Sequence, residues 1–174
     1  MGRLGKCIWL YGLSGSGKST IANELLMRWG PFHVTLLDGD EVRKNLSYGL
    51  GFSKEDRERH ALRVAWVAAE IVRHGGTAIA ALITPYESTR EKIREIVGKE
   101  NLIEVYVDTA LEECEKRDPK GLYKKVRAGE IKNFTGISDP FEFPKEDPDV
   151  IIDTSKCSPI DAVGKIYKVL MDNE

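Results

Sequence analysis

The sequence has few cysteines, and they are not spaced for a metal site or a disulfide framework. The 174-residue chain contains three, at Cys7, Cys114 and Cys157, and no C-x-x-C pair. An odd number without paired spacing argues against a zinc site and against a secreted scaffold held by disulfides. We therefore expect a reducing, cytoplasmic environment.

Long apolar runs and an excess of one charge are also missing. The apolar stretch from Thr77 to Ile83 is far shorter than the roughly 20 residues that span a bilayer, and the N-terminus lacks a signal-peptide core. The formal net charge is -2 at pH 7, so the chain lacks the basic excess of a general nucleic-acid binder. Neither a membrane nor a nucleic acid is an expected partner.

Short apolar runs instead alternate with helical patterns, which predicts an α/β fold with a mostly parallel five-stranded sheet and helices on both faces. Strands are expected at Cys7–Tyr11, His33–Leu37, Thr77–Ile83, Leu102–Val107 and Val150–Ile152. Helices are expected at Ser19–Trp29, Lys54–His74 and Glu87–Val97, after a capping box of Thr109 and Glu112, and after Ser158-Pro159. The length fits a single domain, residues 1–174.

The segment from Pro119 to Pro148 breaks this alternation. It holds four of the seven prolines, and residues 115–132 carry seven basic and three acidic side chains. A basic, turn-rich segment is typical of a lid over an anionic ligand. A solvated surface loop explains the charge equally well, so composition alone leaves both interpretations open.

Residues Gly12–Ser19 read GLSGSGKS and match the full pattern G-x-x-x-x-G-K-[ST]. In this motif glycines let backbone N–H groups surround phosphates, Lys18 reaches the β- and γ-phosphates, and the Ser19 hydroxyl holds Mg²⁺. A chance match in a chain of this size has odds of roughly one in a hundred or less. The motif predicts nucleotide binding, but GTPases and motor ATPases share it. No N-K-x-D guanine loop is present, which favours a small-molecule kinase.

Two aspartates, in the sequence Asp38-Gly39-Asp40, close the second predicted strand. Ligands bind outside the carboxyl ends of strands in open α/β sheets, so both carboxylates are expected to face the phosphate loop. Asp40 is the candidate base or orienter of an acceptor hydroxyl, and Asp38 is a candidate to support Mg²⁺ through water. A turn with a capping aspartate is the alternative.

Arginines and aromatic residues follow in turn-rich segments. Arg43 and Arg57 carry planar forks that suit phosphate or sulfate oxygens. Phe52 and Phe134 either stack a purine or fill the edge of the core, and the pattern does not separate these roles. His60 is ambiguous, since a single histidine is more often structural than catalytic.

Taken together, these strings resemble the adenylyl-sulfate kinases, which convert adenosine 5'-phosphosulfate (APS) to its 3'-phosphorylated form (PAPS). The matching strings are GLSGSGKST at 12–20, LDGDEVR at 37–43, GLGFSKEDR at 49–57, ITPY at 83–86, EVYVDT at 104–109 and, most specifically, RDPKGLYKKVRAGEIKNFTGISDPFE at 117–142. The resemblance covers almost the whole chain. It implies a three-layer P-loop NTPase-like fold with a lid at about 119–148, and γ-phosphate transfer from MgATP to the 3'-hydroxyl of APS in sulfate assimilation.

The resemblance also implies roles for matching positions. ATP phosphates and Mg²⁺ would be held by Gly12, Gly15, Ser16, Gly17, Lys18, Ser19 and Thr20, with Arg117 and Cys157 flanking the adenine. The APS site would comprise Asp40, Arg43, Phe52, Arg57, His60, Ile83, Thr84, Lys120, Asn133 and Phe134. Catalytic roles would fall to Asp40, Lys18, Lys132 and Thr84, with Arg127 assisting Lys132 from the lid.

Two positions depart from the family pattern. His60 stands where the family usually has an asparagine that contacts substrate, and histidine is bulkier and titrates near neutral pH. Thr84 replaces a serine that is described in the family as a phosphorylated intermediate. Threonine keeps the hydroxyl, and direct in-line transfer needs no covalent step. Thr84 is therefore not expected to be an essential nucleophile.

Two other functions compete with this interpretation. A kinase for gluconate, shikimate or a nucleoside would explain the phosphate loop and the two aspartates, but not Phe52 and Phe134. A nucleotide-dependent switch with decayed catalysis would bind ATP without acceptor-dependent turnover. The sequence leaves open whether the chain forms a homodimer, as the family often does, and whether it works beside an ATP sulfurylase.

Overall fold

The five predicted strands form one sheet in which every pairing is parallel, with the order β2-β3-β1-β4-β5. The computed structural model describes residues 5–30 and 34–172. The strands are β1 (Cys7–Tyr11), β2 (Val34–Asp38), β3 (Thr77–Ala81), β4 (Leu102–Val107) and β5 (Val150–Ile152). The predicted fold class is confirmed. The first residue of the second predicted strand, His33, lies outside the described residues.

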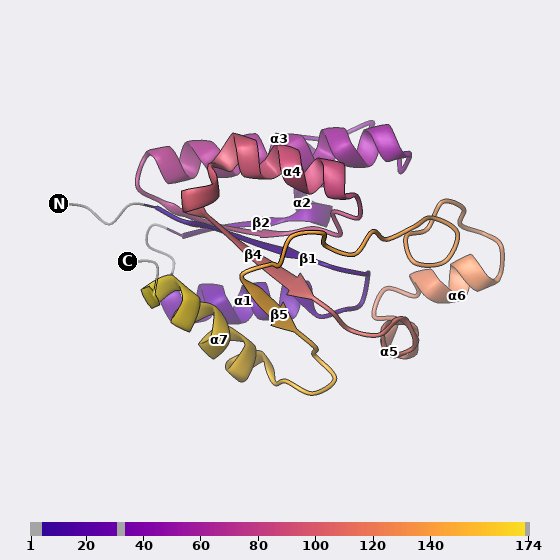
Figure 1. Ribbon diagram of the computed structural model, residues 1–174. Helices are drawn as coiled ribbons and strands as arrows, with labels where there is room; N and C mark the ends of the chain where they lie inside the picture. The colour runs from indigo at the N-terminus through magenta and orange to yellow at the C-terminus, as the bar shows by residue number, and fades with distance from the viewer. Residues whose placement is uncertain (1–4, 31–33, 173–174) are drawn as a thin grey trace.

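The central strand β1 is buried on both faces, which explains its continuous apolar sequence. Cys7, Trp9 and Tyr11 pack into one core, and Ile8 and Leu10 pack into the other. Figure 1 shows α3 (Lys54–Arg73) and α4 (Glu87–Val97) over the first face, and α1 (Lys18–Trp29) and α7 (Pro159–Asp172) over the second. The sheet therefore carries the phosphate loop on a rigid, fully covered strand.

The helix starts are partly as predicted. Ser158 Oγ accepts a hydrogen bond from the Asp161 amide at 3.2 Å, which confirms the cap and first-turn proline of α7. The capping box of Thr109 and Glu112 is wrong. Helix α5 (Leu111–Arg117) begins two residues after Thr109, and its cap residue forms no side-chain cap bond. The Thr109 hydroxyl binds the phosphate loop instead, as described below.

The remaining described elements are two short helices at the carboxyl ends of the strands and one turn that leads from α4 into β4 (Figure 1). They are α2 (Gly39–Asn45), the 3₁₀ turn η1 (Lys99–Asn101) and α6 (Leu122–Arg127). Residues of α5, α6 and the following turn share a small apolar cluster of Cys114, Tyr123, Val126 and Phe134. Figure 1 shows this region beyond the strand ends, on the side where the phosphate loop leaves β1. Among the described residues, no helix is long and apolar enough to cross a membrane.

Candidate active site

A cavity of about 1060 Å³ opens at the carboxyl ends of the strands, between the phosphate loop, α2, the start of α3 and the lid segment. It brings together nearly all the residues that the sequence singled out. The predicted site residues that do not line it are Gly12, Ser16 and Cys157. Arg127 does not line it either, and instead forms a two-pronged ion pair with Glu115 of α5.

The phosphate loop has the backbone that its glycines predict. Gly12, Gly15 and Gly17 have φ angles of 146°, 74° and 104°, a region that side chains disfavour. A Cβ atom on Gly12 would lie 2.4 Å from the Val107 carbonyl oxygen. Glycine is therefore required for the loop to pass this close to β4.

Lys18 points into the loop rather than into solvent. Its Nζ donates to the carbonyl oxygens of Gly12 at 3.0 Å and Leu13 at 2.6 Å, and only 9% of the residue is exposed. Burial lowers the pKa of Lys18 to about 8, because a desolvated ammonium is disfavoured. Lys18 forms no ion pair with a carboxylate of the described residues, and a bound polyphosphate would supply an anionic partner.

Two threonine hydroxyls brace the loop from behind, and the sequence patterns did not reveal them. Thr109 Oγ1 and Thr154 Oγ1 both donate to the Ser16 carbonyl oxygen, at 3.1 and 2.7 Å. Arg117 Nη1 in turn donates to Thr154 Oγ1 at 2.7 Å. Ser16 is thus fully buried as part of the frame of the loop. The brace joins the loop to the arginine predicted to flank the adenine.

Ser19 and Asp38 meet across the cavity floor. The Ser19 hydroxyl donates to Asp38 Oδ2 at 2.9 Å. Asp38 Oδ1 accepts from the Asp40 amide at 3.0 Å and thereby caps α2. The capping alternative is therefore confirmed for Asp38, and the same carboxylate faces the phosphate loop, as expected. The catalytic role of Asp40 and the metal role of Asp38 stay predictions.

These hydroxyl and carboxylate oxygens are the donors that Mg²⁺ prefers. Within residues 5–30 and 34–172, no group of three or more His, Cys, Asp or Glu side chains could hold a metal ion alone. A cation here would need phosphate oxygens and water, which is the usual arrangement for Mg²⁺ in kinases. The donor set fits a metal that arrives with the nucleotide.

Asp40 lies in the first turn of α2 and forms an ion pair with Lys120 of the lid segment. Both side chains are more than half exposed, so the pair contributes little to stability. It spans the cavity between the second strand's end and the lid. A ligand between them can replace this contact at small cost.

Arg43 and Arg57 frame the exposed ring of Phe52. Their guanidinium carbons lie 4.8 and 5.4 Å from its centroid, and 57% of Phe52 is exposed. Burial lowers the pKa of both arginines. Neither forms an ion pair with a carboxylate in the part of the chain that the structure describes. Two adjacent, partly buried cations without a bound carboxylate favour an anionic ligand.

Phe134 and His60 are more deeply packed than Phe52. Phe134 is 8% exposed and meets Tyr123 edge to face at 5.0 Å, so it fills the lid's apolar cluster while bordering the cavity. His60 is buried, with Nδ1 2.9 Å from Ser47 Oγ. Burial lowers the pKa of His60 to about 4, and Arg43 adds to this effect. The imidazole is therefore neutral at physiological pH.

Thr84 has an unusual backbone conformation. Its φ angle is 43°, which is strained for a β-branched residue. Its Oγ1 accepts a hydrogen bond from Trp9 Nε1 at 3.0 Å, and only 4% of the residue is exposed. The turn that contains Ile83 and Thr84 forms a wall of the cavity. This environment suits a positioning role better than nucleophilic attack.

Comparisons with known proteins agree on one family. A family model described as adenylylsulphate kinase matches residues 4–153. A probable adenylyl-sulfate kinase of Halalkalibacterium halodurans is 49% identical over 99% of this chain and 86% of its own length. The solved APS kinase of Mycobacterium tuberculosis, in complex with AMPPNP and APS, is 37% identical with a TM-score of 0.90, covering 97% of this chain and 99% of that one. A probable bifunctional SAT/APS kinase 2 of Sorangium cellulosum is 48% identical over 95% of this chain and 28% of its own length.

Proposed function

The chain belongs to the adenylyl-sulfate kinase family, and from this premise we propose how its cavity transfers phosphate from ATP to the 3'-hydroxyl of APS. The observation that carries the assignment of roles is the cavity itself. One side is a phosphate loop with a buried lysine, and the other carries two arginines around an exposed aromatic ring. A donor and an acceptor nucleotide can therefore bind face to face.

ATP occupies the phosphate-loop side in this proposal. Backbone amides between Gly12 and Ser19 surround the phosphates, and Lys18 turns from the loop carbonyls toward the β- and γ-phosphates. Arg117 packs at the adenine and is held in place through Thr154. Cys157 lies three residues further along the same loop and is half-buried. The location of Arg117 supports the adenine site more strongly than that of Cys157.

A Mg²⁺ ion would bind the Ser19 hydroxyl oxygen directly and the Asp38 carboxylate through a water molecule. When bound, it would neutralise charge on the β- and γ-phosphates. The 2.9 Å contact between Ser19 and Asp38 supports this assignment, because both oxygens already converge on one point of the cavity floor.

APS occupies the opposite side. Arg43 and Arg57 bind the phosphosulfate oxygens, and Phe52 stacks on the adenine, with Ile83, His60, Asn133 and Phe134 completing the walls. Lys120 exchanges its contact with Asp40 for the substrate. In the part of the chain that the structure describes, neither arginine is paired with a carboxylate, and the exposed pair of Asp40 and Lys120 is a weak competitor for the substrate.

Asp40 orients the 3'-hydroxyl and accepts its proton as the ribose oxygen attacks the γ-phosphorus. The bond between the γ-phosphorus and the β–γ bridging oxygen breaks, and ADP leaves with that electron pair. Lys18 and Lys132 stabilise the negative charge on the transferred group from two sides of the cavity. Thr84 shapes the acceptor wall, and no phosphothreonine intermediate is needed.

The cellular setting follows from weaker observations. Three free cysteines support a cytoplasmic location. The Sorangium relative, whose name joins an SAT to an APS kinase in one chain, supports functional pairing with an ATP sulfurylase. We also propose a homodimer, which sedimentation of the purified protein would test.

The direct test of the reaction is ADP release from MgATP with and without APS, with the product identified. We expect APS-dependent ADP and a product phosphorylated on the 3'-hydroxyl. Shikimate and gluconate should neither support nor inhibit turnover. ATP binding without APS-dependent ADP would contradict the proposal.

A further inference from the structure

The last part of the lid, which we call the return arm (residues 139–145), is bonded to the start of α4. The Glu142 amide donates to the Pro85 carbonyl at 2.8 Å. The Glu142 carboxylate accepts from the Glu87 amide at 2.8 Å. The cap residue of α4, Tyr86, forms no side-chain cap bond. A carboxylate 55 residues away along the chain therefore caps this helix.

Arg90 links the same two segments from inside the protein. It is 1% exposed, and its guanidinium donates to the Thr84 carbonyl at 2.9 Å and to the Glu142 carbonyl at 2.6 Å. It lies over the rings of Tyr11 and Phe141, at 5.0 and 5.8 Å. The planar guanidinium of Arg90 thus holds Thr84, the strained residue of the cavity wall, in a fixed position relative to the return arm.

Glu87 completes this connection. It is 2% exposed and forms an ion pair with Arg90 at 2.8 Å. Its Oε2 also accepts from the Lys145 amide of the return arm at 3.3 Å. A buried arginine with carboxylate and carbonyl acceptors has little freedom, because each lost bond would leave a buried charge unpaired. The return arm and the Thr84 turn therefore have one fixed relative position.

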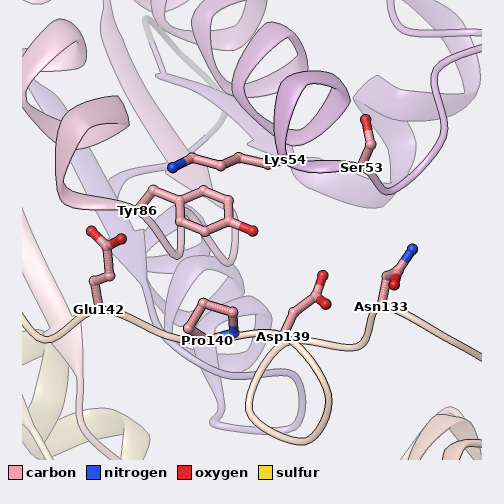
Figure 2. A pocket seen from close by; sticks show the side chains of 7 residues that line it. All are labelled: Ser53, Lys54, Tyr86, Asn133, Asp139, Pro140 and Glu142. Carbon is pink, nitrogen blue, oxygen red and sulfur yellow. The ribbon is translucent and has the colours of Figure 1, made fainter.

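Between its attachments the lid crosses an open cleft. Figure 2 shows this cleft, of about 380 Å³, between the return arm and the start of α3, with Glu142 at one end and Asn133 at the other. At the Asn133 end, Arg57 Nη2 donates to the Asn133 carbonyl at 2.7 Å. The lid is thus joined to the acceptor side by an exposed contact at one end and by partly buried bonds at the other.

We propose that Glu142 and Arg90 are positioning residues that set the acceptor site, by holding the Thr84 turn against the return arm of the lid. The inference rests on the proposed assignment of APS to this side of the cavity. The strained φ angle of Thr84 needs external support. Arg90 supplies it directly at the Thr84 carbonyl, and Glu142 holds the next residues through the Pro85 carbonyl and the Glu87 amide. Neither side chain lines the cavity, so both act through the backbone of residues 84–87.

The test compares Glu142→Ala, Glu142→Gln and Glu146→Ala with the wild type in steady-state kinetics. Glu142 is exposed, so all three variants are expected to fold. Glu142→Ala should raise the KM for APS by about 5- to 10-fold, because a misplaced Thr84 turn weakens acceptor binding, and leave the KM for MgATP within about twofold. Glu142→Gln retains an acceptor oxygen for the Glu87 amide and should stay near the wild type. Glu146 lies just beyond the return arm and forms a surface ion pair with Lys99. Glu146→Ala is therefore the matched control.

Thermal unfolding of each variant separates positioning from simple stabilisation. A lower Tm for Glu142→Ala with an unchanged KM for APS would overturn the inference, as would a parallel rise in both KM values. If the wild type turns over APS normally, either of these results contradicts only the positioning role of Glu142 and Arg90 and leaves the proposed function intact. A wild type without APS-dependent ADP release would overturn both this inference and the proposed function.

Discussion

The two sides of the cavity differ in how much of their geometry exists before a ligand binds. On the phosphate-loop side, Ser16 is fully buried and Lys18 is 9% exposed, with bonds to the loop itself. On the acceptor side, 57% of Phe52 is exposed, and Asp40 meets Lys120 in an exposed ion pair. Backbone and buried bonds fix the first side, whereas long side chains from α2, α3 and the lid form the second.

This difference indicates which substitutions should alter nucleotide binding and which should alter the choice of acceptor. A preformed phosphate loop binds any nucleoside triphosphate with little reorganisation, which agrees with its use in many protein classes. The acceptor side carries exposed side chains, among them Asp40, Phe52 and Lys120, which have room to rearrange around their ligand. Substitutions on the two sides should therefore separate donor binding from acceptor binding.

The largest effect is expected from Asp40→Asn. Removing the proton acceptor should lower kcat by about 10²- to 10⁴-fold, while the affinity for MgATP, measured by calorimetry, stays unchanged. Glu41→Gln is the matched control, because Glu41 is the next residue on α2 and pairs only with Lys44 on the surface. Near-normal turnover of Asp40→Asn would remove Asp40 from the catalytic role.

A smaller, acceptor-specific effect is expected from Phe52→Ala. Loss of one stacking surface should raise the KM for APS by about 5- to 100-fold, since base stacking on an aromatic ring contributes about 1–3 kcal/mol. The KM for MgATP should not change. Trp66 is also exposed, at 59%, and does not line the cavity. Trp66→Ala is therefore the control, and equal effects of the two substitutions would contradict the stacking role.

On the donor side, Thr154→Val should weaken nucleotide binding moderately. The substitution removes one donor to the Ser16 carbonyl and the acceptor for Arg117. A lost buried hydrogen bond costs about 1 kcal/mol, so the KM for MgATP should rise about 5-fold with the KM for APS unchanged. Thr154→Ser keeps the hydroxyl and should restore the wild-type value. A rise confined to the KM for APS would reverse the assignment of the two sides.

The smallest kinetic effect is expected from His60→Asn, which restores the usual family residue. The KM for APS at pH 7 should change less than about 3-fold, because His60 is neutral there. The pH dependence of unfolding is more informative. The folded pKa of about 4 lies below the ordinary histidine value of 6.5, so the unfolded chain binds more protons and His60 lowers stability as pH falls between these values. Urea unfolding at pH 7 and pH 5 should show a smaller loss for the variant than for the wild type.

Local patterns predicted the parts of the molecule that depend on local chemistry. The buried run at Cys7–Tyr11 and the glycines after it specify a strand and a phosphate loop wherever they occur. The same patterns could not predict the brace of Thr109 and Thr154, because these hydroxyls meet only when β4 and β5 pair. Thr109 carried a plausible capping signal, and tertiary packing overrode it.

The acceptor side was harder to predict for a related reason. Glu142 stood at the end of the most specific string, yet nothing in its neighbourhood indicated that it caps α4. Phe52 and Phe134 gave the same signal, but one ring is exposed in the cavity and the other is packed in the lid cluster. Contacts between segments that are distant in the sequence determine the roles of these residues, and the spacing of apolar residues carries no information about such contacts.

Hydrogen exchange, followed by mass spectrometry with AMPPNP, with APS and with both, tests the central contrast most directly. The account predicts that residues 21–29 of α1 are protected before any ligand binds, whereas Asp40–Phe52 and Lys120–Phe134 gain most of their protection only when APS is added. Strong protection of the acceptor segments in the free protein, or protection of residues 21–29 that appears only with nucleotide, would contradict it.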